Sequence, residues 1–110
     1  MRRALCLALA LTAALAGCGE NRIKQAQKLV MDGLTDPASA MFKDDSERPQ
    51  KDGSVAVCGQ VNAKNRMGGY VGYRMYIVAD GKAEIIGEDN ARDFAGRFLE
   101  ICSTTGKSSS

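Results

Sequence analysis

The chain contains no histidine and no tryptophan, and aromatic residues make up only 5% of its 110 residues. Without histidine, the protein lacks the commonest general base and the commonest metal ligand. With so few aromatic residues, any core must be mainly aliphatic and modest in size. A chain of this length forms one domain, and so small a domain benefits from a covalent cross-link.

The chain also lacks an excess of basic residues once its first 17 residues are set aside. That segment contains Arg2 and Arg3, two of the 15 basic residues, and no acidic residue. The remainder therefore has 13 basic and 13 acidic residues and a net charge of zero. A neutral chain without a basic cluster argues against nucleic acid as a partner.

The first 17 residues have the pattern of a secretory signal peptide. Met1-Arg2-Arg3 is a basic start, and residues 4–16 are small or apolar apart from Cys6 and Thr12. Thirteen helical residues span about 20 Å, which is too short for a hydrocarbon core of about 30 Å. We therefore predict that residues 1–17 are a cleaved export signal.

The sequence Leu15-Ala16-Gly17-Cys18 resembles the lipobox of bacterial lipoproteins. The resemblance implies a diacylglyceryl thioether on Cys18 and an acylated amino terminus, so that the first partner is the membrane. Residues 18–22 would then be a lipidated tether. Gly19, in place of an aspartate, favours the outer membrane, with the protein facing the periplasm. An ordinary cleaved signal and an uncleaved anchor are the alternatives.

The four cysteines divide into two groups under this interpretation. Cys6 leaves with the signal and Cys18 carries lipid, so Cys58 and Cys102 remain. An even pair in an oxidising compartment predicts a disulfide between them. Two inert buried thiols are the alternative.

Two segments have the apolar periodicity of helices. The first is Glu20 to Leu34, ended by Asp36-Pro37, which can also start a single new turn. The last helix opens at Asn90, a candidate N-cap. The apolar stripes consist of Ile23, Ala26, Val30 and Leu34 in the first helix, and of Ala91, Phe94, Ala95, Phe98 and Cys102 in the second.

Four short segments between the helices have the character of strands. Pro49 lies in a polar stretch, residues 47–53, which indicates a loop after an edge strand. Gly59 interrupts one alternating row and indicates a bulge or a close backbone approach. Asp80-Gly81 suits a tight hairpin turn. The predicted strands are residues 41–47, 54–63, 73–79 and 82–86, of which 73–79 is apolar on both faces apart from Arg74 and should be central.

Together these elements predict an α+β fold. We expect a small antiparallel sheet of three to four strands, covered by an N-terminal and a C-terminal helix and closed by one disulfide. The domain should span residues 23–103, with residues 104–110 as a disordered tail.

The glycine-rich loop of residues 65–72 is the candidate binding site. A functional interpretation makes it a contact surface for an envelope protein or glycan, with Tyr70 as an aromatic anchor at the tip. The alternative, which we favour, is that the glycines only shape a long hairpin and Tyr70 folds back. The candidate residues are Asn62, Lys64, Asn65, Arg66, Gly68, Gly69, Tyr70 and Gly72.

No other cluster points to chemistry. Asp44, Asp45 and Glu47 lack the spacing of a calcium loop, and we interpret them as a solvated strand edge. We predict no catalytic residue, no metal site and no cofactor. A small envelope enzyme that uses carboxylates is the alternative, and it requires a concave pocket with at least two acidic groups of perturbed pKa.

Two stretches resemble an uncharacterised family of small exported proteobacterial and prophage-encoded proteins. They are Asp36-Pro37-Ala38-Ser39-Ala40-Met41-Phe42 and the segment 57–72, with the pattern C-G-x-V-N-x-K-N-x-x-G-G-Y-x-G. The resemblance covers about half of the mature chain and implies export but no activity. We therefore expect a membrane-anchored, periplasm-facing binding module, or else a structural or prophage accessory lipoprotein.

Overall fold

The computed structural model describes the backbone of residues 18–103 and the side chains from Arg22 onward. The predicted signal peptide and the tail of residues 104–110 lie outside the described residues. The elements are α2 (Cys18–Asp32), the 3₁₀ turn η1 (Pro37–Ser39), β1 (Met41–Pro49), β2 (Val55–Asn62), β3 (Arg74–Ala79), β4 (Lys82–Ile85) and α3 (Ala91–Ile101). Helix α2 begins at Cys18 and so runs through the residues that we expected to form a tether.

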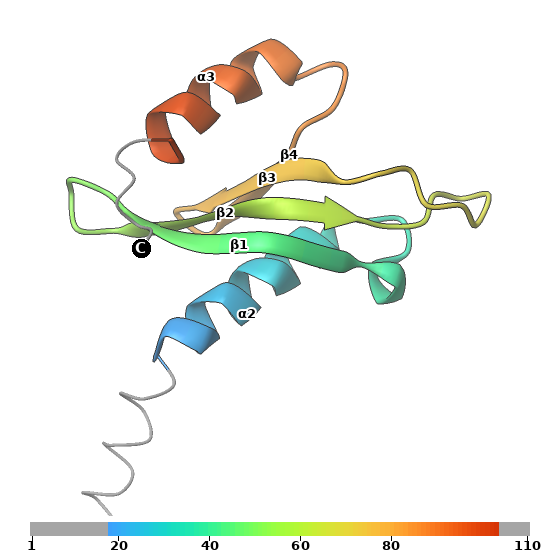
Figure 1. Cartoon of the computed structure of the whole chain (residues 1–110), viewed down its shortest axis with the longest axis horizontal. Helices are drawn as coiled ribbons and strands as arrows, with labels where there is room; N and C mark the ends of the chain where they lie inside the picture. The colour runs from blue at the N-terminus through green and yellow to red at the C-terminus, as the bar shows by residue number, and fades with distance from the viewer. Residues whose placement is uncertain (1–17, 104–110) are drawn as a thin grey trace, which may run out of the picture.

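The four strands form one antiparallel sheet in the order β1-β2-β3-β4, with α2 on one face and α3 on the other (Figure 1). The α+β prediction is thus confirmed, and β3 has the expected interior position. Strand β1 lies at an edge and continues through Pro49, where we had predicted a loop from residue 47. An edge strand tolerates this proline because its missing N–H need not serve a second neighbour.

Alternation along the strands divides the core between the two faces of the sheet. On the α2 face, Val57 and Val61 of β2 pack with Tyr76 and Val78 of β3 against the helix. The predicted stripe of α2 is confirmed, because Ala26 and Val30 are buried there and Ile23 and Leu34 are half-buried beside them. On the α3 face, Cys58, Ile77, Phe94 and Cys102 form a buried cluster.

The predicted disulfide joins Cys58 of β2 to Cys102 at the end of α3, with the two Cα atoms 6.1 Å apart. Helix α3 is tilted, so that its C-terminal end lies nearer the sheet than its N-terminal end (Figure 1). Phe94 is fully buried, but Ala91 and Ala95 are exposed, so their predicted place in the buried stripe was wrong. The helix contacts the sheet through a narrow stripe that contains Phe94, Phe98 and Cys102, so these two alanines remain exposed.

A bulge in β1 brings acidic side chains to the α2 face. Lys43 pairs with Gln60 and Ser46 with Cys58, so Asp44 and Asp45 both lie opposite Gly59. Asp44 has a φ of 59°, the left-handed conformation found in many bulges and turns. The extra residue shifts the alternation, and Asp45 consequently turns toward α2.

Asp45 and Glu47 are therefore not a solvated edge, and that prediction was wrong. The Asp45 carboxylate accepts hydrogen bonds of 2.6 Å from the Tyr76 hydroxyl and of 2.6 Å from the Gln27 side-chain amide. Glu47 forms an ion pair with Arg22 of α2 at 3.2 Å. Burial, together with the hydrogen bond to Asp45, raises the pKa of Tyr76 above its ordinary value. These contacts tie the first helix to the sheet.

Two local predictions have different outcomes. The Asp80-Gly81 turn is confirmed, because both residues have positive φ, 53° and 76°, as a type I′ hairpin requires. Asn90 precedes α3 but its side chain does not cap the helix. Instead, the side chain accepts from the Gly87 N–H and donates to the Ile85 carbonyl, which fixes the connection from β4.

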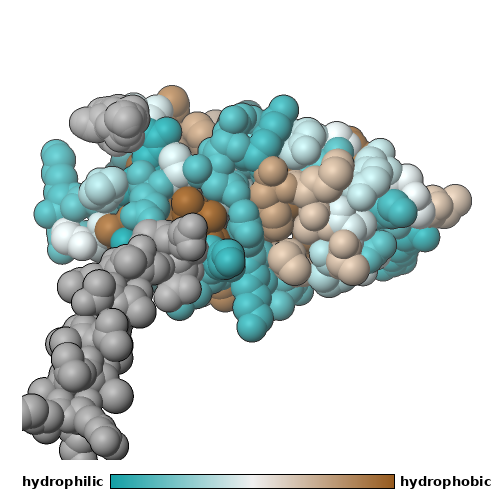
Figure 2. All heavy atoms as spheres, turned by 60° about the horizontal axis from the view of Figure 1, so that its bottom comes forward, coloured by the Kyte–Doolittle hydropathy of each residue, from teal (hydrophilic) through white to brown (hydrophobic). Residues whose placement is uncertain are grey.

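The α2 side of the molecule, brought forward in Figure 2, is largely hydrophilic and is interrupted by separate apolar patches. Within residues 18–103, no helix is both long enough and apolar enough to cross a membrane. Among the side chains from Arg22 to Ser103, no three histidine, cysteine, aspartate or glutamate side chains converge as metal ligands.

Candidate functional site

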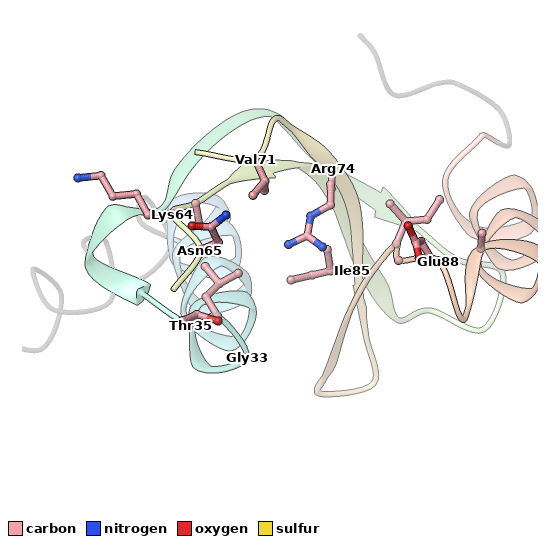
Figure 3. A pocket seen from close by; sticks show the side chains of 13 residues that line it. Gly33, Thr35, Lys64, Asn65, Val71, Arg74, Ile85 and Glu88 are labelled. Carbon is pink, nitrogen blue, oxygen red and sulfur yellow. The ribbon is translucent and has the colours of Figure 1, made fainter. Parts of the chain in front are cut away.

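A groove of about 750 Å³ lies at the end of the sheet where α2 stops (Figure 3). Four segments contribute: the chain after α2, the chain after β2, the start of β3 with the residues before it, and the connection from β4 to α3. Its lining residues are Gly33, Leu34, Thr35, Ala63, Lys64, Asn65, Val71, Arg74, Ile85, Ile86, Gly87, Glu88 and Ala91.

The groove exists because α2 ends before it covers the whole face of the sheet. The helix closes at Asp32 with tight turns, in which the Gly33 and Leu34 N–H groups donate to the Val30 and Met31 carbonyls. Arg74 lies two residues before the buried Tyr76 and so belongs to the same face of β3. Beyond the end of α2, no turn of that helix covers this part of the sheet. Side chains such as Leu34 and Arg74 line the uncovered surface instead.

Arg74 is the cation that points into the groove (Figure 3). Its side chain is exposed, and it has neither an ion pair nor a hydrogen bond to any of the described residues. Lys64 also lines the groove, but its chain points away from it and its Nζ lies 5.6 Å from the centre of the Tyr70 ring. The groove therefore presents one uncommitted guanidinium with five N–H donors.

Asn65 presents a further donor because the loop fixes the orientation of its side chain. The Asn65 Oδ1 accepts from the Met67 N–H at 2.9 Å and from the Gly69 N–H at 3.2 Å. The amide nitrogen is consequently turned the other way, toward Arg74 (Figure 3). Thr35 adds a hydroxyl on the same side.

The walls between these polar groups are aliphatic. Val71 and Ile85 flank Arg74 (Figure 3), and Leu34, two residues after the end of α2, also contributes to the lining. The lining contains one carboxylate, Glu88, rather than the two that the carboxylate-enzyme alternative requires. A mainly apolar surface with a few directed polar groups is typical of a small-ligand site.

The glycine-rich loop is ordered by its own hydrogen bonds. Asn65 and Gly69 close its tip through their backbones, and Lys64 and Tyr70 form a β-bridge. The buried Asn62 closes the base by accepting from the Gly72 N–H at 2.9 Å. Met67 projects from the loop and is 91% exposed.

Tyr70 is not at the tip, which corrects the functional interpretation of that residue. Its ring is half-exposed, and its hydroxyl donates to the Ser39 carbonyl at 3.0 Å. The Ser39 hydroxyl donates to the Asp36 carbonyl at 2.7 Å and accepts from the Lys64 N–H at 2.8 Å. Ser39 thus joins the two stretches that carry the family resemblance.

The candidate loop residues therefore separate into two groups. Lys64 and Asn65 line the groove, whereas the remaining six, among them the exposed Arg66, do not. Sequence reasoning missed Arg74 as a site residue, although a lone charge in an otherwise apolar central strand was the signal that could have identified it. A binding role for the loop itself stays a prediction.

Comparison with protein-family models, with characterised proteins and with solved structures found no match to this chain.

Proposed function

We propose that the protein is a lipid-anchored lipoprotein that faces the periplasm and acts as a small binding module. The lipobox-like Leu15-Ala16-Gly17-Cys18, directly after a short apolar segment with a basic start, is the observation that carries this proposal. Two or more acyl chains on Cys18 would anchor the protein stably, whereas one would hold it only marginally. Gly19 after the cysteine supports the outer membrane as its location.

The disulfide supports export from the cytoplasm. Such bonds persist in oxidising compartments and are rare in reducing ones. The bond between Cys58 and Cys102 fits a periplasmic location for the folded domain. The zero net charge of the mature chain supports an envelope protein or glycan as partner in preference to nucleic acid.

The position of the groove relative to Cys18 supports a binding role. Helix α2 starts at Cys18, and the residues directly after its end line the groove. Fifteen helical residues span about 22 Å. An anchor at the start of the helix would therefore hold the groove away from the lipid surface, where a periplasmic partner can reach it.

Labelling of cells with a fatty-acid probe tests the anchor. We expect label on the wild-type protein and none on Cys18→Ser, which should also leave the membrane fraction. Cys6→Ser is the matched control, because that cysteine lies in the signal and should not affect labelling. Retained label on Cys18→Ser would refute the proposal.

A further inference from the structure

We propose that the groove binds a short peptide with a free carboxyl terminus, which Arg74 holds by its terminal carboxylate. The ligand named here rests on the binding role proposed above. It follows from the kind of hydrogen-bonding group that the groove leaves free, from the charges at its two sides and from the chemistry of its walls.

The groups that point into the groove are mainly donors. Arg74 has no partner among the described residues, and the Asn65 amide nitrogen faces it because the loop backbone occupies the Asn65 oxygen. A ligand that satisfies these donors must bring acceptors. The planar fork of a guanidinium matches a carboxylate with two parallel hydrogen bonds.

The apolar walls favour a carboxylate that is attached to a small apolar group. Val71 and Ile85 lie on either side of Arg74, so an aliphatic side chain next to the carboxylate would contact them. The last residue of a peptide carries its carboxylate and its side chain on one carbon atom, and therefore supplies both contacts at once. A phosphate monoester carries about two negative charges, and the groove directs one cation at its ligand.

Glu88 supplies the acceptor that a peptide also needs. It lies to one side of both Arg74 and Ile85 (Figure 3), and it is exposed. A peptide has N–H donors, and an ammonium group when its amino end is free, which can pair with this carboxylate. A fatty acid has no donor, so Glu88 would repel its charge without compensation.

A titration of the intact purified chain with trialanine tests the assignment. Backbone amide NMR signals of Thr35, Asn65 and Gly87 should shift and saturate with trialanine. They should not do so with trialanine amide, which lacks the carboxylate, or with octanoate, which lacks the N–H donors. Equal shifts with the amide, saturation with octanoate alone or no shift with any probe would each overturn the assignment.

Matched variants locate the contacts. Arg74→Gln should weaken trialanine binding by roughly 10- to 100-fold, the usual range for a charge-assisted hydrogen bond. Arg92→Gln, in α3 and outside the lining, should leave binding unchanged. Both side chains are exposed, so both variants should keep the wild-type melting temperature. Equal affinity for wild type and Arg74→Gln would contradict the proposal.

The test also separates this assignment from the anchor. The titration does not depend on acylation of Cys18. Failure to bind by a chain that carries lipid overturns the ligand alone, and binding by a chain without lipid overturns the anchor alone.

Discussion

The Tyr76 hydroxyl donates a 2.6 Å hydrogen bond to the Asp45 carboxylate from within the core of the α2 face. Tyr76 is completely buried, and its ring also meets Phe42 edge-on, with the ring centres 5.8 Å apart. The contact passes over Gly59, where a side chain would occupy the same space. One glycine, one bulge and one tyrosine therefore connect β1, β2 and β3 beneath the first helix.

Gly59→Ala should destabilise the protein strongly. An alanine Cβ at this position would overlap the Asp45 carboxylate and lie 3.0 Å from both the Asp45 Cα and the Tyr76 ring. We expect a loss of about 2 kcal/mol or more in the free energy of unfolding, measured with urea. Gly69→Ala is the control, because nothing lies within 4 Å of its added Cβ. Equal stability of the two variants would show that the crowding is absent.

Tyr76 should make stability depend on pH in the alkaline range. Its pKa is raised in the folded protein above the ordinary value of 10.0 by burial and by Asp45, so the folded state keeps the proton longer than the unfolded state does. The stabilisation is present below about pH 10 and is lost as the pH rises further, by about 1.4 kcal/mol per pH unit. Tyr76→Phe should show a shallower loss between pH 9 and 11 under non-reducing conditions. If the free energy of unfolding fell equally steeply with pH in wild type and in Tyr76→Phe, Tyr76 would not be the cause of the pH dependence.

The disulfide should hold α3 in place. Apart from its packing, α3 is attached through the Arg97–Glu84 ion pair and through Gln50, whose side-chain amide donates to the Ile101 carbonyl at 3.2 Å. For a separation of 44 residues, the chain-entropy model gives about 4 kcal/mol for the bond. We expect Cys58→Ala/Cys102→Ala to lose a comparable amount.

Hydrogen exchange distinguishes local from global effects of that change. In the double variant, amides of α3 should exchange much faster, whereas amides of α2 and β2 should lose protection only in line with the global stability. Uniform loss of protection across both helices would show that α3 is not an independent unit.

The Tyr70 hydroxyl should contribute modestly to stability. Tyr70→Phe removes its hydrogen bond to the Ser39 carbonyl, and we expect a cost of about 0.5–1.5 kcal/mol. Met67→Ala, at the exposed tip of the same loop, should stay within about 0.5 kcal/mol of wild type. If Met67→Ala lost as much stability as Tyr70→Phe, the prediction that only the Tyr70 hydroxyl stabilises the loop would be contradicted.

Most of the framework was predictable because it follows from periodicity and from cysteine count. Alternation in residues 54–63 and the apolar character of both faces of residues 73–79 identified the inner strands, and assigning Cys6 and Cys18 to export left Cys58 and Cys102 as a pair. The Asp80-Gly81 dipeptide predicted the tight hairpin turn, because these residue types favour it. The strands and the turn depend on residues that are close in the sequence. The disulfide follows from counting the cysteines of the whole chain.

The features of the fold and of the groove that were not predicted depend on tertiary contacts. The bulge at Asp44 reverses the alternation of β1, so two acidic residues that looked solvated face a helix. The exposure of Ala91 depends on how narrow the contact between α3 and the sheet is, which the sequence of the helix does not determine. Arg74 became a site residue only because α2 ends before it covers that part of the sheet.

Intact mass analysis of the protein purified from membranes under non-reducing conditions is the most direct test of the central claim. We predict a chain that begins at Cys18, carries the mass of a diacylglyceryl group and an amino-terminal acyl chain, and retains the Cys58–Cys102 bond. A chain that begins at another residue, or one without added lipid mass, would contradict the account.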